Sequence, residues 1–416
     1  MAEKYVDIII IGSGISGLYS AFKIKNVSED TTFLVLEKHK KNWIGGRTSN
    51  DKFYGTQIVT GAGIGRKHKD KLLYNLLETF HLDTIEFTVS PNYSYLLDKK
   101  VDIVKVVKHL QTEYKKYKHK HHTFKQFATN ILGAKMYKDF VVSSGYSDYE
   151  KEDILETLYH YGMEDNKCCL KAFRVQWQKL VLELYKYIGE KHFKFSNKVV
   201  SITKIREISQ SKTVNYRIET EGGNSYLCNK VIVASTIDTI RRLFPSKPIY
   251  NEIEGQPFLL LYAKFAKKSI PILKQYVPSY TILPGLLQKI IPIDADNGIY
   301  LIAYNDNENA LALKNNLKNT IENREIYQSL LEKSLGISSD SIKIIALKDY
   351  YWNIGTHYYR PLNAKVYSSR EAFIKEAQHP EKDVLVVGEV VSRNQGWVEG
   401  ALESVQAVLT KKWIIE

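Results

Sequence analysis

Three glycines with the spacing Gly12, Gly14 and Gly17 follow an almost unbroken apolar run from Val6 to Ile11. Such a β-branched run is typical of a central strand in a parallel sheet that is covered on both faces. After it, G-x-G-x-x-G is the spacing of a dinucleotide-binding turn. The first glycine permits a tight turn, the second lets the backbone approach a pyrophosphate, and the third lets the next helix pack closely. That helix, expected over residues 18–24, would point its N-terminus at the phosphates. The residues predicted to bind the cofactor here are Gly12, Gly14, Ile15, Ser16 and Gly17.

A second apolar run, Thr32–Leu36, ends in Glu37, twenty residues beyond the last of these glycines. The dinucleotide fingerprint places a carboxylate for the ribose hydroxyls at this point. Lys38 comes next and is assigned to the same site. A glycine-rich turn that binds nothing is the alternative, but the order strand, turn, helix, strand and acid favours binding.

Gly45, Gly46 and Arg47 begin eight residues after that acid. Adjacent glycines let a backbone pass close to a cofactor, and an arginine can donate two hydrogen bonds to phosphate oxygens. Together with the acid, this Gly-Gly-Arg-Thr segment resembles the flavin-containing amine oxidase family, which includes monoamine and polyamine oxidases. Members of that family have an FAD fingerprint at the N-terminus, an acid, a Gly-Gly-Arg segment and a closing FAD segment near the C-terminus.

The resemblance implies an α/β fold with two domains, both built from discontinuous segments. One is a Rossmann-like FAD-binding domain of the GR2 type, expected over residues 1–69, 193–248 and 376–416. The other is an α+β substrate-binding domain over residues 70–192 and 249–375. Its first part reads as mainly helical and its second as rich in strands, from the spacing of the apolar residues.

The resemblance also implies further FAD contacts. A stretch of small residues would lie against the flavin ring, with a flexible surface loop as the alternative; a β-branched residue would contact the adenine. The strand 383–389 would bring Gly-Glu to the ribityl and pyrophosphate end, and the next helix would point its N-terminus at the pyrimidine ring. The residues concerned are Gly61, Ala62, Gly63, Ile64, Val200, Trp352, Gly388, Glu389, Gly396, Trp397, Val398 and Ala401.

Three residues are the candidates for catalysis. By resemblance, Tyr358 and Trp397 would form aromatic walls before the flavin, and such rings attract an ammonium group by about 0.5–2 kcal/mol. Many relatives carry a strand lysine that holds a water near the flavin. Leu260 stands at that position here, so Lys289 on a neighbouring strand is the candidate to replace it. The position at which some relatives attach FAD through cysteine is His357, so FAD is expected to be held without a covalent bond.

The implied reaction is oxidation of a small-molecule amine by hydride transfer to the flavin, with reoxidation by O2 to hydrogen peroxide. Two alternatives remain open. One is another FAD enzyme on the same fold, such as a desaturase or a protoporphyrinogen-type oxidase. The other is a non-catalytic flavoprotein or structural protein that kept the fold.

Composition indicates a folded protein with 44% hydrophobic residues and a net charge of +13. The charge could serve an acidic partner, but an AT-rich coding sequence would also produce it, and no specific nucleic-acid partner is expected. The run 115–122, rich in lysine and histidine, reads as a solvated face, with metal or nucleic-acid binding as alternatives. No metal site or membrane anchor is expected, and an oligomer is possible. Three cysteines are too few for a disulfide framework and suggest a cytoplasmic or other intracellular, reducing compartment.

Overall fold

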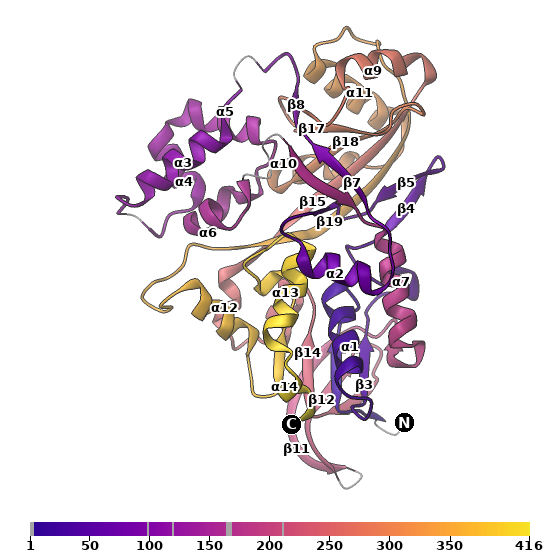
Figure 1. Ribbon diagram of the computed structural model, residues 1–416, viewed down its shortest axis with the longest axis vertical. Coiled ribbons are helices and arrows are strands. Elements are labelled where there is room, and N and C mark those ends of the chain that lie inside the picture. The colour runs from indigo at the N-terminus through magenta and orange to yellow at the C-terminus, as the bar shows by residue number, and fades with distance from the viewer. Residues whose placement is uncertain (1–3, 98–99, 119, 164–168, 210–211) are drawn as a thin grey trace.

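The protein is described by a computed structural model that covers residues 4–97, 100–118, 120–163, 169–209 and 212–416. The lower half of Figure 1 is built on a parallel sheet with the strand order β10-β3-β2-β14-β20. These strands are β2 (Ile8–Ile11), β3 (Phe33–Leu36), β10 (Phe193–Lys194), β14 (Lys230–Val233) and β20 (Val384–Val386). Every residue of β2 and β3 is buried, as expected of apolar strands that helices cover on both faces. The sheet therefore takes its strands from distant parts of the chain.

Helices and a small mixed sheet cover the two faces of this parallel sheet. On one face lie α1 (Ile15–Val27), α2 (Lys71–Thr79), α7 (Trp177–Ile188), α13 (Val398–Val408) and α14 (Lys411–Ile415), whose apolar residues share one core. On the other lie α8 (Ile237–Leu243), α12 (Arg370–Gln378) and the sheet of β1 (Lys4–Tyr5), β13 (Ser225–Cys228), β12 (Lys212–Thr220) and β11 (Val199–Ser209). Both α2 and α7 fall in the span assigned to the substrate domain, yet they pack with α1 and α13. The division into domains stays a prediction.

A mixed sheet forms the upper half of the molecule. Its order is β19 (Ile344–Tyr359), β15 (Ile253–Phe265), β18 (Ile299–Asp306), β17 (Lys289–Asp294), β16 (Thr281–Ile282) and β8 (Asn92–Tyr93). Helices α9 (Ile270–Tyr276), α10 (Asn307–Leu313) and α11 (Ile321–Leu335) accompany it. The long antiparallel pair β15 and β19 runs from the lower half into this sheet (Figure 1).

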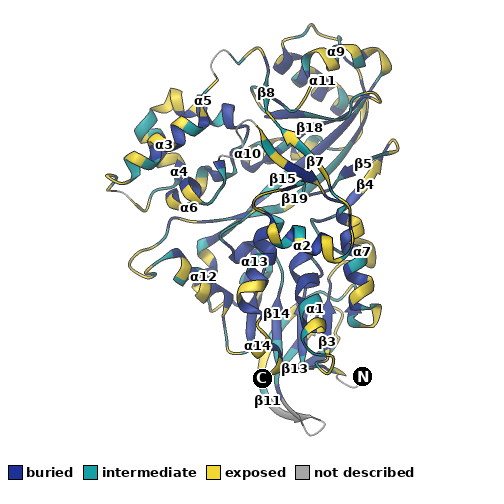
Figure 2. Ribbon diagram, viewed as in Figure 1, coloured by how far each residue is buried: buried dark blue, intermediate teal, exposed yellow. Residues whose placement is uncertain are grey.

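Four helices form a separate lobe, which we call the helical lobe: α3 (Ile103–Tyr114), α4 (Phe124–Leu132), α5 (Ala134–Ser144) and α6 (Ile154–Tyr159). The lobe has its own apolar core, and Figure 2 shows its exposed residues on the outward sides of the helices. The span expected to be mainly helical also contains β7 (Ile85–Val89) and β9 (Leu170–Arg174), which pair with each other, and β9 also pairs with β6 (Ile64–Arg66). A hairpin of β4 (Asn50–Phe53) and β5 (Thr56–Val59) completes the sheets of the described residues.

Short 3₁₀ helices occur at η1 (Lys41–Trp43), η2 (Asp148–Lys151), η4 (Glu190–His192), η5 (Pro248–Glu252), η6 (Lys267–Ser269), η7 (Lys314–Asn316) and η8 (Glu389–Val391). In the part of the chain that is described, no helix is long and apolar enough to cross a bilayer. Cys228 is free and buried, whereas Cys169 is disulfide-bonded. The reducing compartment expected from the few cysteines stays a prediction.

Candidate functional site

The turn between β2 and α1 has the geometry that the glycine spacing predicts. Gly12 has a φ of +104°, and a Cβ there would lie 2.3 Å from the carbonyl oxygen of Ala234. A Cβ on Gly17 would lie 2.0 Å from the carbonyl oxygen of Gly12, so the helix packs against the turn as expected. Gly14 is the N-cap of α1, no side chain caps this helix, and a Cβ on Gly14 would meet nothing within 4 Å. The uncapped N–H groups of Ile15 and its neighbours therefore face space that can take an anion.

Two distant segments close on this turn. Gly45 donates its N–H to the carbonyl oxygen of Ser13 at 2.9 Å, and a Cβ on Gly46 would lie 3.7 Å from the Cα of Gly14. From the other end of the chain, Gly388 has a φ of +128°, and its added Cβ would lie 3.6 Å from Oγ of Ser16. The fold thus brings three predicted cofactor segments together around the N-terminus of α1.

Glu37 lies at the carboxyl end of β3 and is buried. Its Oε2 accepts hydrogen bonds from the N–H and the hydroxyl of Ser13, both at 2.8 Å, and its Oε1 accepts from the N–H of His39 at 2.9 Å. The acid predicted to bind the ribose is therefore hydrogen-bonded to the glycine turn. Its main chain pairs with the loop before β11, because the N–H of Asn197 donates to the carbonyl of Glu37.

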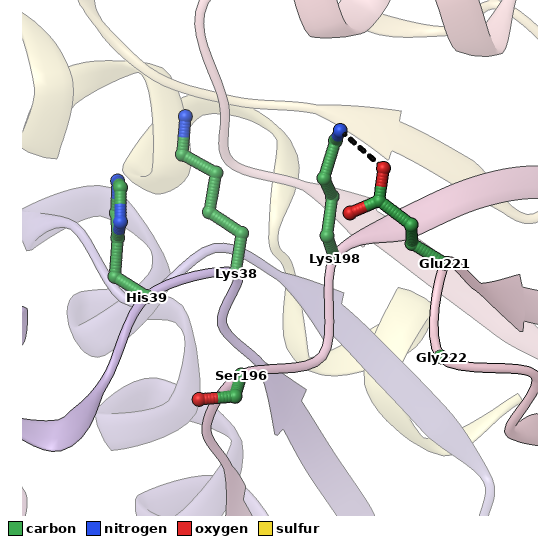
Figure 3. Close-up of a pocket in the computed structure, with 6 residues that line it drawn as sticks. All are labelled: Lys38, His39, Ser196, Lys198, Glu221 and Gly222. Carbon is green, nitrogen blue, oxygen red and sulfur yellow. Dashed lines mark hydrogen bonds and ion pairs between the residues drawn. The ribbon is translucent and has the colours of Figure 1, made fainter.

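A pocket of about 510 Å³ opens beside this acid (Figure 3). Figure 3 shows Lys38 on one side and the ion pair between Lys198 and Glu221, at 2.8 Å, on the other. The remaining lining residues are His39, Ser196 and Gly222. Val200 lies nearby on β11 at a register shift between Val199 and Ser201, and is 37% exposed. The arrangement leaves room for an adenosine at the end of the site.

The guanidinium of Arg47 does not point into open space, because it is bonded to other residues of the protein. Its Nη1 donates to the carbonyl of Gly355 at 2.5 Å and pairs with Oε1 of Glu389 at 3.0 Å. Glu389 also accepts from Nδ1 of His357 and from the N–H of Gly396 at 3.1 Å. Burial alone would raise the pKa of Glu389, but His357 and Arg47 hold it well below its ordinary value. This carboxylate therefore stays ionised and joins β19 to the closing segment.

His357 has both ring nitrogens engaged. Nε2 accepts the N–H of Ile237 at 3.2 Å, so the proton lies on Nδ1 and is donated to Glu389. The side chain is fully buried. This ring is built into the interior and has no nitrogen left to bond a flavin.

Hydrogen bonds to backbone carbonyl oxygens hold the small-residue stretch 61–64 in place. Ala62 donates its N–H to the carbonyl of Arg47 at 2.8 Å, and Trp177 Nε1 donates to the carbonyl of Gly63 at 3.3 Å. Trp352 Nε1 donates to the carbonyl of Thr60 at 2.7 Å. A Cβ on Gly61 would lie 2.3 Å from the Arg47 carbonyl oxygen. The stretch, which ends at Ile64 on β6, is a fixed part of the site.

Trp397 lies over a buried arginine. The guanidinium of Arg66 is 3.8 Å from the centre of the Trp397 ring, and it pairs with Asp70 at 2.7 Å. Trp397 is also the N-cap of α13, where Val398 begins the first turn and Ala401 donates its N–H to the carbonyl of Trp397 at 3.3 Å. The guanidinium of Arg66, which is itself paired with Asp70, thus lies against one face of the Trp397 ring and fixes its plane.

Tyr358 and Trp397 are not in ring contact in the described part of the chain. Tyr358 lies opposite Glu254 on the neighbouring strand, and burial and then the charge of Glu254 raise its pKa. The residue beside Gly396 is Thr356, whose Cγ2 would lie 3.4 Å from an added Cβ on Gly396. The Thr356 hydroxyl is buried and has no hydrogen-bond partner in the described residues.

Lys289 lies at the start of β17 and is completely buried. Its Nζ is 3.1 Å from the ring centre of Tyr146 and 4.8 Å from that of Tyr304, and it has no hydrogen-bond partner among the described residues. Tyr304 connects this cluster to the small-residue stretch, because its hydroxyl would lie 3.7 Å from a Cβ on Gly63. The side chain of Tyr304 therefore lies between Lys289 and the small-residue stretch that is predicted to face the flavin ring.

Two carboxyl groups accompany this lysine. Asp306 accepts from the hydroxyl of Ser147 at 2.5 Å, and Asp148 accepts from the hydroxyl of Tyr161. Burial lowers the pKa of Lys289 to about 7, although Asp306 and Asp148 act in the opposite direction. Burial, and then the neighbouring carboxyl, raise the pKa of Asp148 above its ordinary value, and burial raises that of Asp306. Burial thus lowers the pKa of the lysine and raises the pKa values of the two carboxyl groups, so it disfavours the charged form of all three.

Sequence reasoning did not identify several of these residues. Asp148 lies in the helical lobe and Asp306 at the end of β18, and neither belongs to a motif. Glu399 is another: its carboxylate accepts the N–H groups of Leu72 and Leu73 at 2.8 and 3.0 Å and so joins α13 to the start of α2. The pairing of Arg66 with Asp70 had no signal either, because the rule for pairs four residues apart holds on helices and these two residues flank a turn.

The fold and this arrangement define the class: an α/β protein with a Rossmann-like nucleotide-binding domain and a second, mixed domain. A sequence model of the NAD(P)-binding Rossmann-like domain matches residues 10–80. No curated protein matches the sequence. The expected fold class is confirmed.

Among solved structures, the chain is similar over its whole length to putrescine oxidase. A double mutant from a redesign of cofactor binding in that enzyme superposes with a TM-score of 0.74 at 14% identity, with 100% of both chains covered. The wild-type enzyme bound to putrescine gives a TM-score of 0.72 at 13% identity, with 98% of both chains covered. The resemblance to the amine oxidase family is thus confirmed for the fold.

Proposed function

We propose that this protein is an FAD-dependent oxidoreductase that oxidises an amine. The observation that carries the proposal is the meeting of the glycine turn, Gly45-Gly46 and Gly388 around the uncapped start of α1, with Glu37 at one end and Trp397 in the closing segment. The likeness in fold to an enzyme solved with putrescine supports the same reading. Bound FAD would accept a hydride from the carbon next to the nitrogen and pass its electrons to O2, giving hydrogen peroxide.

The residues around the turn would hold the cofactor. The N–H groups at the start of α1 would bind the pyrophosphate, Glu37 the ribose and the region of Lys38 and Val200 the adenosine end. Arg47 is already bonded to Glu389 and Gly355, so we assign it a positioning role that orients the Gly-Glu segment toward the ribityl chain.

FAD would be held without a covalent bond. The candidate for attachment, His357, is buried with Nδ1 on Glu389 and Nε2 on the N–H of Ile237. The side chain next to Gly396 is Thr356, which is not a flavin-linking residue type.

Lys289 would take the place of the strand lysine that many relatives carry to hold a water near the flavin. It is completely buried behind Tyr304 and Gly63, so its role would be indirect. Trp397, held by Arg66, would form one wall of the approach, and Tyr358 stays a candidate for the second.

The test is a spectrum followed by turnover. The purified protein should show flavin absorbance, or acquire it when FAD is added, and should release peroxide with at least one member of a panel of monoamines, diamines, polyamines and amino acids. Bound FAD without turnover of any amine would favour a desaturase, a protoporphyrinogen-type oxidase or a non-catalytic flavoprotein. A protein that cannot take up FAD would overturn the proposal.

A further inference from the structure

The positive charge of this protein is concentrated in one short segment. Residues 105–138 contain nine lysines, no arginine and a single acid, Glu113, which gives a net charge of +8 out of +13. The rest of the chain balances 50 basic against 45 acidic residues. A second stretch, residues 255–293, has no acid and five lysines, but the excess of positive charge is larger in residues 105–138.

All nine lysines are exposed, and they belong to the helical lobe. Four of them form what we call the α3 ridge: Lys105 and Lys108 lie with His109 and Thr112 on the outer face of α3, and Lys115 and Lys116 follow directly after its last residue, Tyr114. At 100° per residue, Lys105 and Lys108 lie about 60° apart around the helix, and at 1.5 Å per residue the helix from Lys105 to its end extends over about 14 Å. The opposite face, with Ile103, Val106, Val107 and Leu110, is buried in the core of the lobe.

Acidic neighbours cancel little of this charge. Asp102 pairs with Lys105 at 3.5 Å, and Glu113 with Lys116 at 3.9 Å. Exposed pairs of this kind contribute on the order of 0–1 kcal/mol and are screened by salt. Within the described residues, Lys108 and Lys115 have no ion-pair partner. The ridge therefore presents a positive field to solvent.

The chemistry of the α3 ridge distinguishes between anionic partners. Helices that bind lipid surfaces combine cations with apolar side chains that enter the bilayer. The exposed face here contains only lysine, histidine and threonine between residues 105 and 116, and its apolar side is already packed. A phosphate backbone requires cations alone, because its affinity comes mainly from released counterions.

We propose that the α3 ridge binds the phosphate backbone of nucleic acid without sequence preference. Readout of base edges relies most often on the planar forks of arginine, asparagine and glutamine, although lysine can also bind guanine, and none of the exposed residues of the ridge carries such a fork. The segment has no arginine, and the nearest ring, Tyr114, is half-buried against Phe127 with Lys120 over its face. The ridge lies in the helical lobe and uses none of the residues assigned to FAD, so this inference stands or falls independently of the proposed oxidase.

The test compares two variants of equal net charge. In the first, Lys105, Lys108, Lys115 and Lys116 are all replaced by glutamate; in the matched control, the exposed residues Lys267, Lys268, Lys333 and Lys343 are replaced by glutamate instead. Binding to a labelled duplex DNA of about two helical turns is followed by fluorescence anisotropy at several salt concentrations. Circular dichroism and thermal melting confirm that both variants are folded.

The wild type should bind with a slope of log K against log salt near −4, on the basis of roughly 0.9 per phosphate contacted. The ridge variant should lose at least tenfold in affinity and most of that slope, while the control stays within about threefold of wild type, since the contacts and not the net charge are lost. Equal losses in both variants, or no salt-dependent binding by the wild type, would overturn the proposal. So would ridge-dependent binding to phosphatidylserine vesicles with no binding to DNA.

Discussion

Replacing Lys289 by methionine tests whether the buried cluster holds a lysine with a lowered pKa. The folded pKa of about 7 lies below the ordinary 10.5, so between these values the unfolded chain binds more protons than the folded one. Stability then rises with pH across this window. At 1.36 kcal/mol per pKa unit, the penalty at low pH is about 5 kcal/mol, of which about 2 kcal/mol is recovered between roughly pH 7 and pH 9.

Methionine has a side chain of similar length but no charge, so Lys289→Met removes this pH-dependent contribution to stability. It also leaves Asp148 and Asp306 without their neighbouring cation, so their pKa values should rise further. A carboxyl whose folded pKa is raised loses its contribution to stability as pH rises. The free energy of unfolding of Lys289→Met should therefore stay level or fall between these two pH values, while that of the wild type rises.

The measurement is urea denaturation of the FAD-loaded protein, followed by circular dichroism at each pH. Lys267→Met, which removes an exposed lysine from η6, is the matched control and should follow the wild type. Buried tyrosines of the cluster, such as Tyr146 and Tyr304, are common to all three proteins, so their titration cancels in the comparison. Parallel pH profiles for wild type and Lys289→Met would refute the reasoning.

Three further outcomes are expected. Gly17→Ala should abolish FAD uptake and lower the melting temperature by several degrees, because its Cβ would lie 2.0 Å from the carbonyl oxygen of Gly12; absorbance and calorimetry check this. Glu389→Gln removes a buried charge that accepts three hydrogen bonds and should cost roughly 2–4 kcal/mol of unfolding free energy in urea titrations. Trp397→Leu uncovers the guanidinium of Arg66 and should raise KM for amines more than it lowers kcat, by roughly tenfold if the ring contributes about 1–2 kcal/mol; an unchanged KM would remove Trp397 from the substrate path.

Residues whose roles depend on their neighbours in the sequence could be predicted from local patterns. The turn at Gly12 and Gly17 follows from close backbone contacts that only glycine permits, so its residues were identifiable from spacing. Glu37 could be predicted because it stands at the carboxyl end of an apolar strand, where the dinucleotide fingerprint places an acid. The fold class then followed from the family resemblance that these motifs carry.

Polar groups that interact with residues far away in the sequence were harder to predict. Asp148 and Asp306 are 158 positions apart in the sequence, and only the packing of the helical lobe on β18 brings them together. Thr356 lies beside Gly396, and Tyr358, two residues further on, shares its face of β19, so the place of Tyr358 before the flavin stays a prediction. Arg47 was expected on phosphate, and its partner Glu389 lies at the other end of the chain. Pairings at such separation depend on tertiary contacts that no local pattern records.

The order of strands in the parallel sheet also has a consequence for synthesis. β2 lies in the middle, between β3 and β14, but β14 begins about 220 residues after β2 ends. While those residues are made, one edge of an all-isoleucine strand has no partner in the sheet, and such edges recruit other chains. We expect the nascent protein to need a chaperone until residue 233 has emerged, and to take up its cofactor only after the closing segment at 384–401 is complete.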